Sequence, residues 1–170
     1  HGLPHFAISI AGEREGTLEF GVVYDPMRGE LFRAERGAGA YLNDQRLQVS
    51  ATSALADSLL VTGFPYDLRE NPHNNLDLFA HMARQSLAVR RFGAAALDLA
   101  YVAAGRFDAY WELRLSPWDL AAGIVLVREA GGAVSRVDGG PDILSPPPSI
   151  AASNGRLHGD LLEALGAGRG

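Results

Sequence analysis

A single carboxylate, Asp119, stands where an apolar helix is expected to begin, and it is well placed to do chemistry. Ser116 is typical of an N-cap, Pro117 of a first helical position, and Gly131 of a helix end. Together they predict a helix over 116–130. Asp119 in its first turn can complete a capping box with Ser116, worth about 1 kcal/mol, or it can point into a cleft and bind a metal ion. The spacing alone leaves both interpretations open.

A second predicted helix begins with small residues only. The segment 87–91 has the pattern of a strand, and 94–104 that of an alanine-rich helix, with Gly93 between them. Backbone N–H groups at the start of a helix lack intrahelical partners and bind phosphate oxygens well. At Gly93, Ala94 and Ala95 no bulky side chain would block such a ligand. Ordinary close packing of small residues is the alternative explanation of this pattern.

Two absences restrict the chemistry further. The sequence has no cysteine, and all 15 of its basic residues are arginine. Disulfides, cysteine-ligated zinc and thiol nucleophiles are therefore excluded. A Walker-type phosphate loop and a Schiff-base mechanism both need lysine, so they are excluded as well. Catalysis by this chain would have to use carboxylates, hydroxyls, histidines or a bound metal ion.

Ser153 lies at a strand-to-helix turn, the position of the nucleophile in many hydrolases. Such a serine needs an acid and then a histidine downstream, and His158 alone follows it. The chain that remains is too short to complete a triad. We therefore interpret Ser153 and Asn154 as caps of the last helix.

Composition indicates one globular domain, 1–170. Hydrophobic residues make up 47% of the chain, which is enough for a real core. The net charge is -5 and the arginines are scattered, so no nucleic-acid surface is predicted. No apolar run approaches the roughly 20 residues of a membrane span, and no signal peptide opens the chain. We expect no membrane partner and a cytoplasmic location.

The elements change character along the chain. The first third reads as an antiparallel meander, because short apolar strands alternate with turn residues. In the second half strands alternate with helices, as in a layered α/β or α+β domain. The predicted strands are 6–11, 16–24, 30–35, a short one ending near 49, 58–62, 87–91, 108–112, 133–137 and 150–152, and the predicted helices are 75–85, 94–104, 116–130 and 157–165.

The segment Trp118-Asp119-Leu-Ala-Ala-Gly123, followed by an apolar helix and Glu129-Ala-Gly-Gly132, resembles the second signature of the inositol monophosphatase family. The resemblance extends over nearly the whole chain and keeps the order of the family's segments. The further matching segments are 2–10, Gly21-Val-Val-Tyr-Asp-Pro26, Gly37-Ala-Gly-Ala-Tyr-Leu-Asn43, Thr62-Gly-Phe-Pro-Tyr66, 93–105 and Ala151-Ala-Ser-Asn-Gly155.

This resemblance implies an α+β fold, a layered α-β-α-β-α sandwich of the inositol monophosphatase and fructose-1,6-bisphosphatase type. The chain would be the C-terminal two-thirds of that fold, as a single domain over 1–170. The N-terminal helices would be absent, which would expose apolar surface on a sheet and make the 170-residue chain poorly soluble. A homodimer is the assembly usual in the family and is expected here.

The resemblance also implies roles for individual residues. Asp119 would be a catalytic residue and a Mg²⁺ ligand. Gly93, Ala94 and Ala95 would face the phosphate and the substrate ring, and Glu112 would accept hydrogen bonds from a substrate hydroxyl. Without the resemblance, Glu112 would be an ordinary solvent-facing strand residue. The family usually has Ser or Thr where this chain has Ala94, so one hydroxyl is missing but the backbone donor remains.

The implied activity is a Mg²⁺-dependent phosphomonoesterase that hydrolyses inositol monophosphate or a related small polyol or sugar phosphate. The complete enzyme would use two or three Mg²⁺ ions. Fructose 1,6-bisphosphate, a 3′-phosphonucleotide and histidinol phosphate are alternative substrates. The family's Glu-Glu and Asp-Pro-x-Asp-Gly-Thr motifs, which carry most metal ligands, would precede His1. A non-catalytic, phosphate-binding fragment is therefore the alternative from another class.

Overall fold

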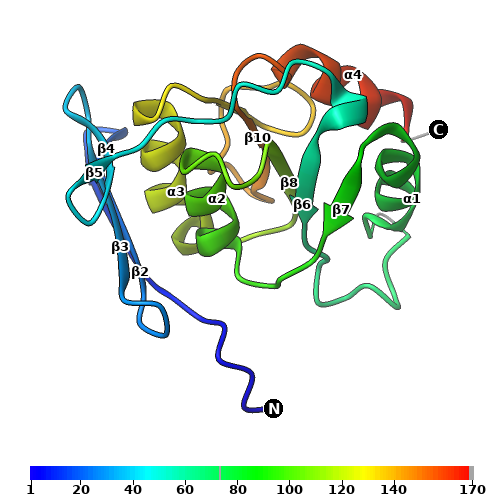
Figure 1. Cartoon of the computed structure of the whole chain (residues 1–170). Coiled ribbons are helices and arrows are strands. Elements are labelled where there is room, and N and C mark those ends of the chain that lie inside the picture. Colours follow the sequence, from blue (N-terminus) through cyan, green and yellow to red (C-terminus); the bar gives the residue numbers. More distant parts are fainter. Residues whose placement is uncertain (73, 169–170) are drawn as a thin grey trace.

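Two sheets and two pairs of helices alternate in layers (Figure 1). The computed structural model describes residues 1–72 and 74–168. Helices α2 (Ala95–Ala103) and α3 (Pro117–Glu129) lie between the sheets, and α1 (Leu76–Gln85) and α4 (His158–Ala167) cover the far side of the second sheet. The layers follow the order sheet, helices, sheet, helices. This order matches the expected α-β-α-β-α sandwich without its first helical layer.

The first sheet is the predicted antiparallel meander, with its strands in sequence order. Its side chains alternate strictly: Val23, Phe32 and Ala34 are buried against the central helices, and their neighbours along the strands point outward. The predicted strand 6–11 begins two residues later than expected. The strands are β1 (Ile8–Arg14), β2 (Thr17–Asp25), β3 (Glu30–Glu35), β4 (Gly39–Leu42) and β5 (Gln45–Arg46).

The second sheet is mixed, and its strand order β7-β6-β8-β10-β9 departs from the order of the sequence. Strand β6 pairs in parallel with β7 and with β8, whereas β10 is antiparallel to both of its neighbours. Each strand overlaps its predicted range. A short 3₁₀ helix, Leu55–Asp57, precedes this sheet. The strands are β6 (Leu59–Thr62), β7 (Ala88–Arg90), β8 (Ala109–Leu113), β9 (Ala133–Ser135) and β10 (Ser149–Ser153).

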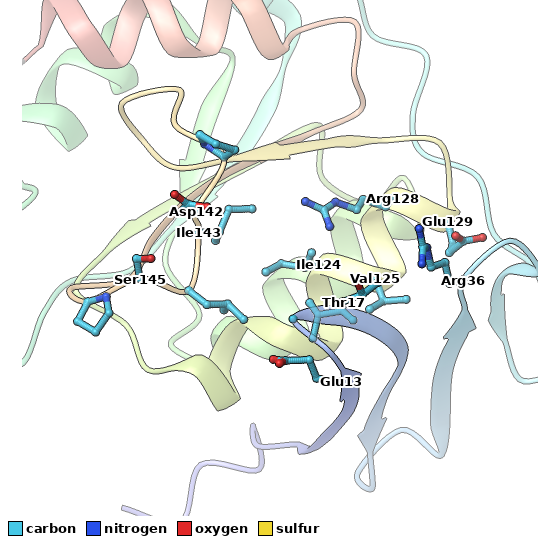
Figure 2. A pocket seen from close by; sticks show the side chains of 15 residues that line it. Glu13, Thr17, Arg36, Ile124, Val125, Arg128, Glu129, Asp142, Ile143 and Ser145 are labelled. Atoms are coloured by element: carbon cyan, nitrogen blue, oxygen red, sulfur yellow. The ribbon is translucent and has the colours of Figure 1, made fainter.

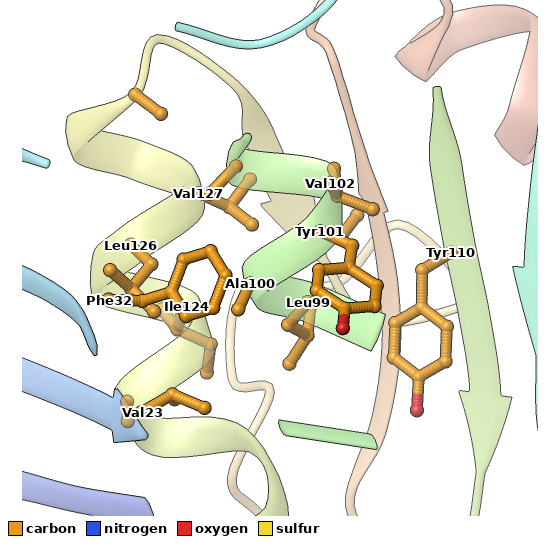
Figure 3. Close-up of a cluster of buried hydrophobic side chains, with 14 of the residues drawn as sticks. Val23, Phe32, Leu99, Ala100, Tyr101, Val102, Tyr110, Ile124, Leu126 and Val127 are labelled. Atoms are coloured by element: carbon orange, nitrogen blue, oxygen red, sulfur yellow. The ribbon is translucent and has the colours of Figure 1, made fainter. Parts of the chain in front are cut away.

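The central helices hold the main core together (Figure 3). Leu120 and residues 122–127 of α3 are buried, so the middle of this helix is covered on all sides. The two helices approach closely at Gly123, where an added Cβ would lie 2.5 Å from Leu99 Cβ. A glycine is therefore required at this crossing.

The outer face of the first sheet carries apolar side chains. Ile8, Ile10, Phe20 and Leu31 are 37–54% exposed, and they stand on the face opposite the central helices. Apolar exposure on this sheet is as predicted. In the described part of the chain, none of the helices combines the length and the apolar character that crossing a bilayer requires.

Candidate active site

Asp119 caps α3 with one of its two oxygens. The Ser116 N–H donates a hydrogen bond of 2.9 Å to Asp119 Oδ2, and the Asp119 N–H donates to the Ser116 carbonyl oxygen at 3.0 Å. The predicted capping role is therefore present. Within the described residues no hydrogen bond reaches Asp119 Oδ1, and the side chain is only partly buried. The cap and a metal-ligand role are compatible, because each can use a different oxygen.

The start of α2 is open, as the small residues predicted. Gly93 has φ +87° and is exposed, and Ala94 to Ala96 are half-buried. No side chain in the described residues caps this helix. A Cβ at Gly93 would overlap Arg91 Nη1, so the Arg91 side chain folds over the glycine. Free backbone donors and a guanidinium thus face the same point, which suits an anion.

Glu112 on β8 is buried, so its alternative reading as a solvent-facing residue is wrong. Its side chain is 9% exposed, and the Tyr110 hydroxyl donates a hydrogen bond of 2.6 Å to Oε2. Burial raises the pKa of Glu112 and the charge of Asp119 adds to this, whereas the Tyr110 hydrogen bond and the Arg91 charge oppose it. Strand β8 therefore turns this carboxylate into the interior, against Tyr110 and Gly63.

Glu112 and Asp119 lie on either side of a short loop, because β8 ends at Leu113 and α3 begins at Pro117. Glu112 interacts with the charge of Asp119 at the start of α3 and with that of Arg91, which covers Gly93 at the start of α2. The predicted site thus comprises a partly buried carboxylate, an uncapped helix N-terminus and a second, buried carboxylate. Such a combination can hold a phosphate ester by its phosphate and by a hydroxyl of its alcohol.

Sequence reasoning missed one member of this region, Asp98 on α2. It is fully buried, and neither carboxylate oxygen has a hydrogen-bond partner within the described residues. Burial, and then the charge of Glu112, raise its pKa to about 8, while the charge of Arg91 acts in the opposite direction. The sequence signal that could have indicated Asp98 is that it is the one acidic residue inside the apolar stretch 95–103.

The described residues do not form a complete metal site of three or more side-chain ligands. They contain no group of three or more His, Asp or Glu side chains close enough to share an ion. Asp119 Oδ1 is the kind of oxygen donor that Mg²⁺ prefers, so Asp119 fits the expected metal as one ligand.

Comparison with known proteins identifies the fold family. A sequence profile described as the inositol monophosphatase family matches residues 1–168. The chain is 48% identical over 165 residues to the inositol-1-monophosphatase of Mesorhizobium japonicum, which covers 97% of this chain and 62% of that protein. It is 52% identical over 169 residues to the Nus factor SuhB of Pseudomonas aeruginosa, which covers 97% of this chain and 61% of that protein.

The chain belongs to the inositol monophosphatase family.

Solved structures of this family share the fold. The inositol monophosphatase from Anabaena (Nostoc) sp. PCC 7120 matches with a TM-score of 0.92 and 48% identity, over 95% of this chain and 64% of that one. A structure described as SaIMPase-II with inositol monophosphate bound matches with a TM-score of 0.84 and 34% identity, over 96% of this chain and 64% of that one. They confirm the layered α+β fold. The chain spans about three fifths of the length of the curated relatives.

The serine at the β10-to-α4 turn does not form a nucleophilic site in this family member. Ser153 is fully buried and its Oγ lies 3.1 Å from His158 Nδ1, but His158 Nε2 lies 3.0 Å from Ser135 Oγ, where a triad would have a carboxylate. The predicted capping by Ser153 and Asn154 is wrong, because the N-cap of α4 is Leu157. Their side chains instead accept N–H bonds within the preceding turn.

The cavity drawn in Figure 2 lies away from these residues, between the β1–β2 hairpin, the second half of α3 and the loop 141–146. Its volume is about 650 Å³, and neither Glu112, Asp119 nor the start of α2 lines it. The candidate site at the N-termini of α2 and α3 is thus distinct from this cavity.

Proposed function

We propose that the complete protein is a metal-dependent phosphomonoesterase that releases inorganic phosphate from inositol monophosphate or a related small polyol phosphate. The observation that carries this proposal is the uncapped start of α2, where Gly93 lies against the Arg91 guanidinium. Asp119 at the start of α3 adds a carboxylate whose Oδ2 alone is used by the cap. An inositol-1-monophosphatase at 48% identity and a similar structure with inositol monophosphate bound support the proposal.

The phosphate group is bound by the start of α2 in this proposal. Backbone N–H groups at Gly93, Ala94 and Ala95 donate to its oxygens, and the helix dipole favours its negative charge. Because Ala94 has no hydroxyl, the backbone supplies the donors at this position. The Arg91 guanidinium beside Gly93 adds positive charge.

Glu112 orients the alcohol part of the substrate. A carboxylate accepts hydrogen bonds from hydroxyls, so it distinguishes a polyol phosphate from an ester without neighbouring hydroxyls. Fructose 1,6-bisphosphate, a 3′-phosphonucleotide and histidinol phosphate also carry groups that Glu112 could bind, and they remain substrates to compare.

Asp119 holds a divalent cation in this proposal, and Mg²⁺ is the expected ion. Such ions lower the pKa of a bound water and neutralise charge on the phosphate and the leaving oxygen. The described residues offer Asp119 as one ligand, so further ligands would come from parts of the relatives that this chain does not span. Asp119 would keep its orientation through the Ser116 N–H bond while Oδ1 faces the ion.

The test is phosphate release from myo-inositol 1-phosphate by the complete protein, with and without Mg²⁺. Asp119→Asn keeps an oxygen for the Ser116 N–H, so the free energy of unfolding should change by less than about 1 kcal/mol. Turnover should fall by at least about a hundredfold, because the ligand charge is lost. Unchanged turnover with a large loss of stability would reduce Asp119 to a helix cap.

A second candidate is a Nus-factor role, which the name of the Pseudomonas relative at 52% identity favours. Expression in an Escherichia coli strain that lacks its own SuhB would test it. Rescue by the wild type and equally by Asp119→Asn would indicate a role that does not need hydrolysis. The expected homodimer is tested separately by light scattering of the complete protein.

A further inference from the structure

Only one oxygen of the Glu112 carboxylate is available to a ligand. Oε2 accepts the 2.6 Å hydrogen bond from Tyr110, whose side chain is fully buried. Within the described residues no hydrogen bond reaches Oε1, and Oε1 is not among their buried, unpartnered atoms. Tyr110 belongs to the same buried core cluster as Leu99, and Figure 3 shows its hydroxyl directed away from Val102. The core thus fixes the ring, and the ring fixes one carboxylate oxygen.

The opposite side of the carboxylate rests on backbone. A Cβ at Gly63 would overlap both oxygens and the carboxyl carbon of Glu112. Gly63 follows β6, which pairs in parallel with β8, and Thr62 lies opposite Trp111 in that pairing. The position of Glu112 therefore depends on how firmly the end of β6 is held against β8.

Asn75 fixes that end with a buried hydrogen-bond network. Its Nδ2 donates to Thr62 Oγ1 at 2.9 Å and to the Gly63 carbonyl oxygen at 2.6 Å. Its Oδ1 accepts a hydrogen bond of 2.7 Å from Trp111 Nε1, on the residue before Glu112.

The network is closed and specific to an asparagine side chain. Thr62 Oγ1 donates to the Trp111 carbonyl oxygen at 2.6 Å. Asn75 is 4% exposed and adopts φ +76°, a conformation that asparagine tolerates better than most residues. Both polar atoms of the Asn75 side-chain amide, Nδ2 and Oδ1, are therefore bonded to β8 or to the end of β6.

We propose that Tyr110 and Asn75 are positioning residues that hold Glu112 with Oε1 toward the substrate, and so set the preference for polyol phosphates. The inference rests on the proposed function. Tyr110 acts directly on the carboxylate, whereas Asn75 acts through Gly63 and Trp111. Neither residue touches the phosphate, so both affect recognition of the alcohol and leave the hydrolytic step intact.

The experiment compares two substrates of the complete enzyme with Mg²⁺: myo-inositol 1-phosphate, and p-nitrophenyl phosphate, which has no hydroxyl beside its ester. Tyr110→Phe removes one oxygen from a buried ring. It should lower kcat/KM for myo-inositol 1-phosphate by about tenfold, mainly by raising KM. It should change kcat/KM for p-nitrophenyl phosphate by less than about twofold. In Asn75→Gly the new glycine tolerates the positive φ of this position. This variant should shift the ratio of the two kcat/KM values in the same direction as Tyr110→Phe.

Tyr101→Phe is the matched control. The Tyr101 hydroxyl also donates to a buried carboxylate, Asp25 at 3.4 Å, but that carboxylate does not contact Glu112 in the described structure. This variant should leave the substrate ratio unchanged. In a Glu112→Ala background, Tyr110→Phe should have no further effect on the ratio, because the group through which it acts is gone.

The outcomes separate the two proposals. Equal losses for both substrates in Tyr110→Phe and Asn75→Gly, or a further change of the ratio in the Glu112→Ala background, would overturn the positioning role and leave the phosphatase intact. A wild-type protein that hydrolyses neither ester with Mg²⁺ would overturn the proposed function, and the positioning role with it.

Discussion

Asp98 is a carboxylic acid in an environment that disfavours its charged form. A carboxylate that is fully buried and without hydrogen bonds pays a large desolvation penalty when it is ionised. The raised pKa of about 8 means that Asp98 carries a proton at neutral pH. A neutral Asp98 lets Glu112 ionise nearby without a second negative charge.

Asp98 should therefore make stability depend on pH. Its pKa is raised in the folded state from 3.8 to about 8, so the folded protein binds the extra proton between these values. The stability that this proton contributes is complete below pH 3.8 and is lost as pH rises through about 8. Asn mimics the neutral acid at position 98. The free energy of unfolding of Asp98→Asn, relative to that of the wild type, should therefore grow by up to about 1.4 kcal/mol per pH unit within that window.

Urea unfolding of both proteins at pH 5, 7 and 9 measures this advantage. Asp142→Asn, a change at an exposed aspartate, serves as the control and should show no comparable trend. A constant difference between wild type and Asp98→Asn at all three pH values would mean that Asp98 is ionised in the folded protein.

At the scale of elements, the site depends on how closely α2 and α3 pack, because their N-termini carry the open backbone donors and Asp119. Gly123 allows that approach, since an added Cβ would lie 2.5 Å from both Leu99 Cβ and Cδ1. The same helix approaches β2, where a Cβ at Gly21 would clash with the backbone of Ala122. Both contacts exclude any larger residue.

Gly123→Ala should therefore destabilise the protein by about 1–3 kcal/mol, although alanine is the better helix former. The matched control is Gly159→Ala in α4, where an added Cβ meets no atom within 4 Å. That variant should be neutral or more stable by up to about 1 kcal/mol. Thermal unfolding distinguishes the two, and a stabilised Gly123→Ala protein would contradict the close packing.

Helix α4 is attached to the second sheet through His158, which lies 3.0 Å from Ser135 Oγ on β9 and 3.1 Å from Ser153 Oγ on β10. Partial burial lowers the pKa of His158. The neutral ring is thus favoured in the folded state. The stability that it contributes is present above the unfolded pKa of about 6.5 and is lost as pH falls through the folded value.

Amide protection in α4 should consequently decrease from pH 7.5 to pH 5, relative to α3, in hydrogen-exchange measurements. His158→Gln cannot titrate, so the difference between the two pH values should disappear in that variant. Equal protection of α4 at both pH values in the wild type would show that His158 does not secure this helix.

At the scale of the whole molecule, the sheet-helix-sheet-helix order leaves one broad apolar face uncovered. Ile8, Ile10, Phe20 and Leu31 are 37–54% exposed on the outer side of the first sheet. Contiguous apolar surface of this kind is unusual on an isolated soluble domain and favours association. This region corresponds to the place of the first helical layer in the layered sandwich.

The 170-residue chain expressed alone should therefore self-associate, and Ile10→Lys with Phe20→Lys should increase its soluble monomer fraction several-fold. Leu87→Lys is the control, because Leu87 is 69% exposed but lies outside this face. Size-exclusion chromatography with light scattering gives the answer. A monomeric, soluble wild-type chain would contradict the prediction.

The sequence by itself determined the elements and the family. Strand alternation, the residues around Ser116 and Pro117, and the apolar run of α3 are local signals, and most predicted helices and strands were found with shifts of a few residues. The exception is the short strand predicted to end near 49, where the chain forms two strands, β4 and β5, that end by residue 46. The Trp118-Asp119 segment identified the family for the same reason, since a signature is a run of neighbouring residues.

Only the tertiary structure decided the surroundings of the carboxylates. Glu112 was open to a solvent-facing reading because its strand pattern does not say which elements cover β8. The β7-β6-β8-β10-β9 order places Gly63 against Glu112, and the fold brings Asn75 to Trp111, across 36 residues of sequence. Burial and pKa depend on such distant neighbours, so the raised pKa of Asp98 and the burial of Glu112 could not be read from local pattern.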